Sequence, residues 1–81
     1  MAPQIMEPMY VTYDKEANAA YIGFAKVTSG EVSETIEIEL PESVSGDLNL
    51  DLDKKGKILG VEVLNASEIL PAALLKRAKE L

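Results

Sequence analysis

Carboxylates are the side chains in this sequence whose type and spacing could support chemistry. Four of them lie in segments where polar and apolar residues alternate: Glu37, Glu39, Asp51 and Glu62. Side chains of a strand alternate between its two faces, so these carboxylates are expected on one face of a sheet. Clustered carboxylates can bind a hard cation or separate their pKa values for acid–base work. Both uses need a cleft, whereas the outer face of a sheet is convex and wet. We therefore expect a solvated surface or a face for a basic partner.

The stretch from residue 51 to 62 has a faint similarity to a calcium-binding loop. Asp51, Asp53 and Gly56 match the spacing of two oxygen ligands and the glycine of such a loop. Glu62 matches its final carboxylate, but Lys55 stands where another oxygen ligand is required. The flanking residues also alternate as strands do, whereas a calcium loop is flanked by helices. The sequence therefore predicts a charged hairpin turn, with neither a metal nor another cofactor.

No nucleophile in the sequence has an evident base to activate it. Histidine and cysteine are both absent, which removes a Ser–His pair and the usual ligands of structural zinc. A Ser–Lys pair remains open in principle, although the lysines gather at turns and in the C-terminal segment. No glycine-rich phosphate-binding loop is present. We expect a protein without enzymatic activity.

Three tyrosines gather around the first predicted hairpin: Tyr10, Tyr13 and Tyr21. Aromatic residues at this spacing usually pack across neighbouring strands. Tyrosine is also favoured at interface hot spots, so Tyr10 and Tyr21 are candidate anchors for a dimer or a partner. Few basic residues surround them, which argues against a platform for stacking nucleic-acid bases.

Length and charge narrow the class of protein further. A chain of 81 residues with 47% hydrophobic residues is expected to form one globular domain. The net charge of -6, from 14 acidic and 8 basic residues, disfavours direct binding to nucleic acid. It suits a small basic protein partner, or solubility alone.

Neither a membrane nor a secretion signal is indicated by the pattern of hydrophobic residues. No apolar run approaches the roughly 20 residues that cross a bilayer, and the first residues lack the basic and apolar regions of a secretory signal. We therefore expect a cytoplasmic protein. Residues 1–9 hold two prolines and little pattern, which favours a flexible tail before a single domain over residues 10–81.

The elements that would position these residues are mostly strands. Alternating or β-branched segments predict strands over residues 10–14, 19–26, 32–40, 47–53 and 59–64. Turns are expected at 14–18, 28–30, 41–46 and 54–56, with Gly56 taking a positive φ. Gly23, inside a strand, indicates a bulge or a close backbone approach. The sum is an α+β fold: a single antiparallel meander of about five strands followed by one C-terminal helix.

The C-terminal segment repeats its apolar residues at helical spacing. Pro71 suits the first position of a helix, with a break from the short turn that Ser67 and Glu68 would cap. A helix of about 11 residues is about 16 Å long, too short to cover a five-stranded sheet about 19–24 Å wide. Exposed apolar surface of this kind usually marks an association site. We therefore expect a homodimer or an obligate partner, held by the helix residues Leu70, Leu74, Leu75 and Leu81 with the sheet face beneath.

Two segments of the chain resemble a known family of bacterial and archaeal proteins. They are YDKEANAAYIGF (residues 13–24) and LDLDKKGKILGVEVLNAS (residues 50–67), and they resemble the Domain of Unknown Function 2283 family. With the strand between them, the resemblance covers residues 10–67. It implies a small β-rich domain closed by a helix, and no reaction. The departure is Asn18, where family members usually carry Asp, although both residues make local bonds to the backbone.

Two functions follow as expectations from this reading. The first is a non-enzymatic protein–protein interaction module that forms a homodimer. The second rests on the resemblance, because some family members are found beside small toxin-like genes. That association implies an antitoxin-like regulator, which would neutralise a small basic toxin through the acidic residues Glu37, Glu39, Asp51 and Glu62. A metal-dependent enzyme or sensor is the third and least favoured possibility.

Overall fold

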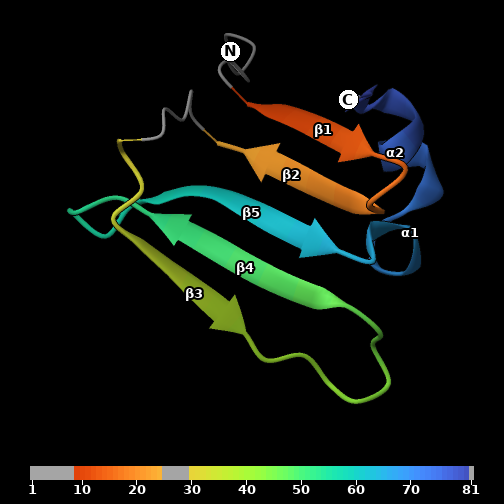
Figure 1. Ribbon diagram of the computed structural model, residues 1–81, viewed down its shortest axis with the longest axis horizontal. Helices are drawn as coiled ribbons and strands as arrows, with labels where there is room; N and C mark the ends of the chain where they lie inside the picture. The colour runs from red at the N-terminus through yellow and green to blue at the C-terminus, as the bar shows by residue number, and fades with distance from the viewer. Residues whose placement is uncertain (1–8, 25–29, 81) are drawn as a thin grey trace, which may run out of the picture.

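One twisted sheet with two short helices at one end makes up the protein (Figure 1). The computed structural model describes residues 9–24 and 30–80. Its elements, in chain order, are β1 (Tyr10–Asp14), β2 (Ala19–Gly23), β3 (Glu34–Ile38), β4 (Asp47–Leu52), β5 (Ile58–Leu64), α1 (Ala66–Ile69), α2 (Ala72–Arg77) and β6 (Lys79–Glu80). The α+β class and the five antiparallel strands are therefore confirmed. Most of the predicted N-terminal tail, and residues 28–29 of the predicted turn at 28–30, lie outside the described residues.

The order of the strands corrects the predicted meander. The sheet runs β3-β4-β5-β2-β1-β6, so β2 pairs with β5 and not with β3. The hairpin of β1 and β2 and the meander of β3, β4 and β5 are thus two units joined side by side. A single meander would have left β5 at an edge, although β5 carries the buried residues Leu59, Gly60 and Val63. In the observed order β5 is central, and the edge position falls to β3, most of which is exposed.

Register places the side chains of the sheet on two distinct faces. One side, which we call the inner face, carries two rows of apolar residues that each cross five strands. The first row is Tyr13, Ala20, Val63, Leu48 and Ile38. The second row is Val11, Ile22, Val61, Leu50 and Ile36. The opposite side, which we call the outer face, carries Tyr10, Tyr21, Glu62, Asn49, Asp51, Thr35 and Glu37. The predicted alternation of β3, β4 and β5 is confirmed.

The C-terminal segment differs from the single helix that its periodicity predicts. Leu70 is extended (φ -100°, ψ 149°), as expected for a residue that precedes proline, so the chain forms two short helices separated at Pro71. The break is confirmed, but the length of about eleven residues is wrong. After Arg77 the chain becomes extended, and β6 pairs in parallel with β1. This pairing satisfies backbone groups that β1 would otherwise expose at an edge. Leu81 lies outside the described residues.

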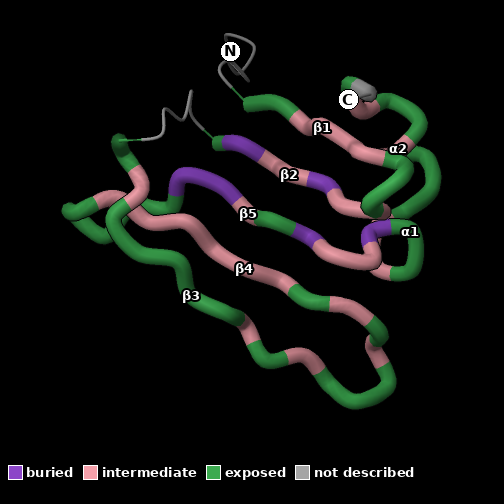
Figure 2. The backbone as a smooth tube through the Cα atoms, viewed as in Figure 1, coloured by how far each residue is buried: buried purple, intermediate pink, exposed green. Residues whose placement is uncertain are grey.

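The buried core is small and lies toward one end of the sheet. Among the described residues, the buried apolar side chains are Ala20, Leu59, Val63 and Ala66. Ile69, Leu70 and Leu75 from the helical segment pack against this core. Figure 2 shows burial following β2, β5 and the beginning of α1, while most of β3 is exposed. The helices therefore cover the end of the inner face near Tyr13, Val63 and Leu48, and not the part formed by β3 and the end of β4 near Leu52.

Candidate functional site

Part of the inner face has no cover from either helix. Ile36 is 37% exposed and Ile58 47% exposed, while Leu50 and Leu52 are half-buried. Ile36 lies opposite Leu50, and Leu52 lies opposite Ile58, so these side chains adjoin one another across β3, β4 and β5. We call Ile36, Leu50, Leu52 and Ile58 the apolar strip.

The helix leucines proposed from the sequence as contact residues have a different environment. Leu70 and Leu75 pack against the protein's own core, and Leu74 is half-buried on α2. The apolar residues left exposed belong instead to the sheet. Sequence reasoning expected the apolar sheet face to contribute, but the sheet residues that it named as candidates, Tyr10 and Tyr21, lie on the opposite face. The alternation of Ile36 and Ile38 was the available signal, although the edge position of their strand was not predicted.

On the outer face, two tyrosines lie over glycines of neighbouring strands. The ring of Tyr10 covers Gly23, and the ring of Tyr21 covers Gly60, so that a Cβ atom on either glycine would collide with a ring. The two rings lie 6.2 Å apart between centroids, tilted by 32°. The predicted close approach at Gly23 is confirmed, whereas the role of Gly60 was missed. Tyr10 and Tyr21 thus pack across strands of their own sheet, on the face opposite the helix leucines.

The carboxylates of the outer face take part in hydrogen bonds within that face. The Tyr21 hydroxyl donates to Asp51 Oδ2 (2.9 Å), and Thr35 Oγ1 donates to Asp51 Oδ1 (2.7 Å). Asn49 Nδ2 donates to Glu62 Oε1 (3.2 Å). Burial, the hydrogen bond to Asp51 and the charge of that carboxylate raise the pKa of Tyr21 well above its ordinary value.

The predicted acidic cluster is brought together only in part. Glu37, Asp51 and Glu62 lie on the outer faces of the adjacent strands β3, β4 and β5, while Glu39 follows the end of β3. Within residues 9–24 and 30–80, no three carboxylates come together in a group that could hold a metal ion.

The turn that resembles a calcium loop is closed by its own carboxylate. Asp53 Oδ1 accepts hydrogen bonds from the backbone N–H groups of Lys55 (2.8 Å) and Lys57 (2.9 Å). The bond from Lys57, that from Lys55 and the charges of both lysines hold the pKa of Asp53 below its ordinary value. Gly56 has a φ of 83°, as predicted. This is the charged hairpin turn that the sequence indicates.

Asn18 connects the first hairpin to the start of α1. It has a positive φ of 53°, and its Oδ1 accepts hydrogen bonds from the Tyr13 hydroxyl (2.8 Å) and the Ser67 backbone N–H (3.0 Å). Its Nδ2 donates to Asn65 Oδ1 (3.0 Å) and Ser67 Oγ (2.9 Å). Its carbonyl also accepts from the Ala66 N–H (2.9 Å). All the polar atoms of the side chain are therefore used.

Asn65 extends this network to the loop before β4. It too has a positive φ, of 62°, and its Nδ2 donates to the carbonyl of Ser45 (2.8 Å). We call Tyr13, Asn18, Asn65 and Ser67 the asparagine latch. The latch holds α1 against the end of the sheet through bonds between residues as many as 49 positions apart. The N-cap of α1 is Asn65, whose side chain makes no capping bond. Ser67, which was expected to cap this turn, instead bonds to Asn18 through its backbone N–H and its hydroxyl.

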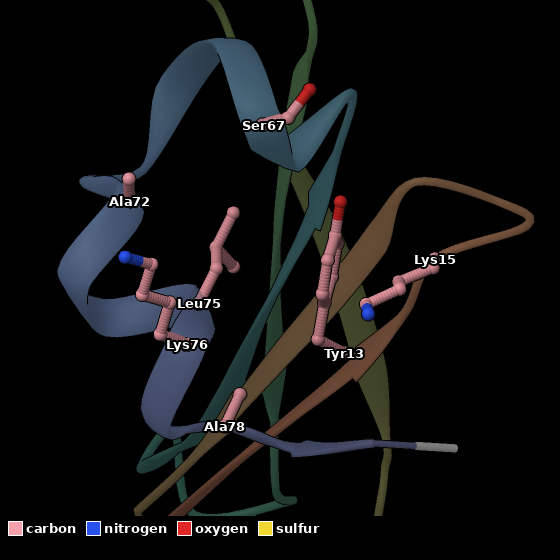
Figure 3. A pocket seen from close by; sticks show the side chains of 7 residues that line it. All are labelled: Tyr13, Lys15, Ser67, Ala72, Leu75, Lys76 and Ala78. Carbon is pink, nitrogen blue, oxygen red and sulfur yellow. The ribbon is translucent and has the colours of Figure 1, made fainter.

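A hollow of about 390 Å³ lies between the latch and α2. Its lining residues are Tyr13, Lys15, Ser67, Ala72, Leu75, Lys76 and Ala78. In Figure 3, Leu75 points from α2 toward the ring of Tyr13, whose hydroxyl is directed toward Ser67. Lys15 lies beside Tyr13, and Lys76 lies on the side of α2. No pattern in the sequence indicates this hollow, because its two walls are more than fifty residues apart in the chain.

Comparison with known proteins identifies the family to which the chain belongs. Residues 10–67 match the family described as Protein of unknown function (DUF2283), and the chain therefore belongs to that family. The match covers both segments in which the resemblance was found. No curated protein and no solved structure matches the chain. In the described part of the chain, no helix has the length and apolarity needed to cross a membrane.

Proposed function

We propose that this protein is a small, non-enzymatic association module in which two copies meet through the apolar strip. The observation that carries the proposal is the incomplete cover of the inner face. One end is closed by Ile69, Leu70 and Leu75, whereas Ile36 and Ile58 remain more than a third exposed at the other. A contiguous apolar surface of this kind usually marks an interface.

The small size of the core supports the same proposal. Val63 is the largest side chain that is fully buried among the described residues. A domain of this size gains limited stability from burial within one chain. A second copy would remove further apolar area from water at about 25 cal/mol per Å². Glu34, on the same face at the edge of the strip, would lie at the polar rim that interfaces commonly have.

Two substitutions in the same strand test the proposal. Ile36→Lys places a charge in the apolar strip. Glu37→Lys introduces the same side chain at the next residue, which lies on the outer face of the sheet. Light scattering after size exclusion should give the wild type and Glu37→Lys a mass twice the 8.8 kDa of one chain, and Ile36→Lys the mass of one. Circular dichroism would verify that both variants fold. A folded Ile36→Lys protein that still dimerises would remove the strip from the interface.

As the alternative, we propose a basic protein partner on the outer face, as for an antitoxin-like regulator. The observation that favours it is the position of Glu37, Asp51 and Glu62 on three adjacent strands. Attraction between opposite charges would steer such a partner to this face. Glu37→Lys should then weaken the capture of a small basic protein encoded beside this gene, while Ile36→Lys should not. Equal capture by both variants would contradict this alternative.

A further inference from the structure

We propose that the hollow between Tyr13 and α2 binds a small organic anion, a carboxylate or phosphate ester joined to an apolar body. Nothing in the proposed dimer depends on this hollow, because the apolar strip lies over β3, β4 and β5 and the hollow is lined from β1 and α2. Its volume of about 390 Å³ lies toward the lower end of the range of about 300–1,000 Å³ typical of small-molecule sites.

The charge of the lining favours an anion. Lys15 and Lys76 line the hollow from different elements, the turn after β1 and the helix α2. The chain as a whole carries a net charge of -6, yet the charged residues that line the hollow are both lysines. Lysine offers three donors and suits an anionic oxygen as a point charge. A carboxylate or phosphate held between the two elements would bring their positive charges together.

The rest of the lining favours an apolar body on the ligand. The ring of Tyr13 and the side chain of Leu75 face one another (Figure 3), and Ala72 and Ala78 add only methyl groups. Small side chains at these two positions leave room that larger ones would fill. An aromatic or short aliphatic group fits between Tyr13 and Leu75, where it would be stacked on the ring.

The polar wall of the hollow is already held in place by the latch. The Tyr13 hydroxyl donates to Asn18 Oδ1 (2.8 Å), which fixes the ring, and Ser67 Oγ accepts from Asn18 Nδ2 (2.9 Å). Ser67 therefore keeps its own hydroxyl hydrogen as a donor for a ligand. A site whose walls are fixed before binding avoids part of the ordering cost of association.

Titration of the wild-type protein with simple probes tests the proposal. Benzoate and phenyl phosphate supply an aromatic body with each anion, benzamide supplies the body without charge, and inorganic phosphate supplies charge without a body. Two-dimensional amide NMR should show saturable shifts at Tyr13, Ser67 and Leu75 with benzoate or phenyl phosphate, and weaker ones with the other two probes. Whichever of benzoate and phenyl phosphate binds more tightly tells whether the site prefers a carboxylate or a phosphate. Benzamide that binds as tightly as benzoate would overturn the proposal, as would the absence of saturable shifts.

A pair of neighbouring charge reversals provides the matched control. Lys76→Glu changes a residue that lines the hollow, whereas Arg77→Glu makes an equal change in net charge one residue later, outside the lining. Loss of a charge-assisted contact and its replacement by repulsion should weaken binding about tenfold or more for Lys76→Glu. Arg77→Glu should stay within about twofold of the wild type because surface charges act only weakly. Equal effects of the two substitutions would show that the hollow is not the site.

Discussion

The two faces of this sheet alternate equally well in sequence, yet they differ in how their side chains find partners within one chain. The outer-face side chains contact one another across the strands, although Tyr10 remains 37% exposed. On the outer face, Tyr21 covers Gly60 and donates to Asp51, which also accepts from Thr35. On the inner face, the helices cover the row near Val63 but leave Ile36 and Ile58 exposed.

The contrast shows where a small domain leaves the apolar surface that it cannot bury within one chain. Polar and aromatic side chains can satisfy one another across neighbouring strands, because their hydrogen bonds and ring contacts need no second layer. Aliphatic side chains have no such option and need a covering layer. With a helical segment of two short helices, the chain can supply that layer at one end only. The other end is therefore where we place a second copy.

Removing the hydrogen bonds of the asparagine latch should have the largest effect on stability, because these bonds hold the helices over the inner face. Asn18→Ala removes four side-chain hydrogen bonds and places alanine at a φ of 53°. We expect the free energy of unfolding, measured with urea, to fall by about 2–4 kcal/mol.

Asn18→Asp provides a graded comparison for the latch. The carboxylate can still accept from Tyr13 and the Ser67 backbone N–H, and the Ser67 hydroxyl can donate to it in place of accepting, but the bond to Asn65 Oδ1 is lost. The loss of stability should therefore lie between those of the wild type and Asn18→Ala. An Asn18→Ala protein as stable as the wild type would show that the latch does not hold the cover in place.

A methyl group on the outer face should have the next largest effect. In Gly60→Ala the added Cβ collides with the ring of Tyr21, which must move away from Asp51. Overpacking of this kind costs about 1–3 kcal/mol, measurable as a lower midpoint of urea unfolding. Gly30→Ala is the matched control, because nothing lies within 4 Å of its Cβ position. If both variants unfold at the same urea concentration, the ring of Tyr21 does not need the space over Gly60.

Removing one hydroxyl should have the smallest effect. Tyr21→Phe loses the bond to Asp51, which should cost about 1 kcal/mol.

The same substitution should also change the dependence of stability on pH. The raised pKa of Tyr21 means that the folded chain keeps its phenolic proton when the unfolded chain loses it, above a pH of about 10. Stability is therefore full below that pH and falls as the pH rises above it. Urea unfolding at neutral and alkaline pH should show a steeper fall for the wild type than for Tyr21→Phe. Parallel curves would contradict the link to Tyr21.

Local patterns in the sequence predicted the parts of this fold that depend on neighbouring residues. Alternation placed Ile36 and Glu37 on opposite faces, Gly56 indicated its turn and Pro71 the break between helices. Each of these follows from the geometry of a few consecutive residues.

The remaining features depend on residues far apart in the chain. Neither β2 nor β5 carries a signal for the other, so alternation could not give the strand order. The bonds of Asn18 to Asn65 and Ser67 were missed for the same reason, although an asparagine in a tight turn did indicate local hydrogen bonding. The extended segment after Arg77 was also missed, because Leu74 and Ala78 repeat at helical spacing regardless of whether β1 needs a partner.

The proposed contact between two copies through the inner face can be tested by the labelling rate of single cysteines on the two faces of β3. The chain has no cysteine of its own, so Ile36→Cys and Glu37→Cys each create one reactive thiol. If a second copy covers the inner face, labelling at position 36 should slow as the protein concentration rises, while labelling at position 37 should not change. Rates that are independent of concentration at both positions would contradict the account.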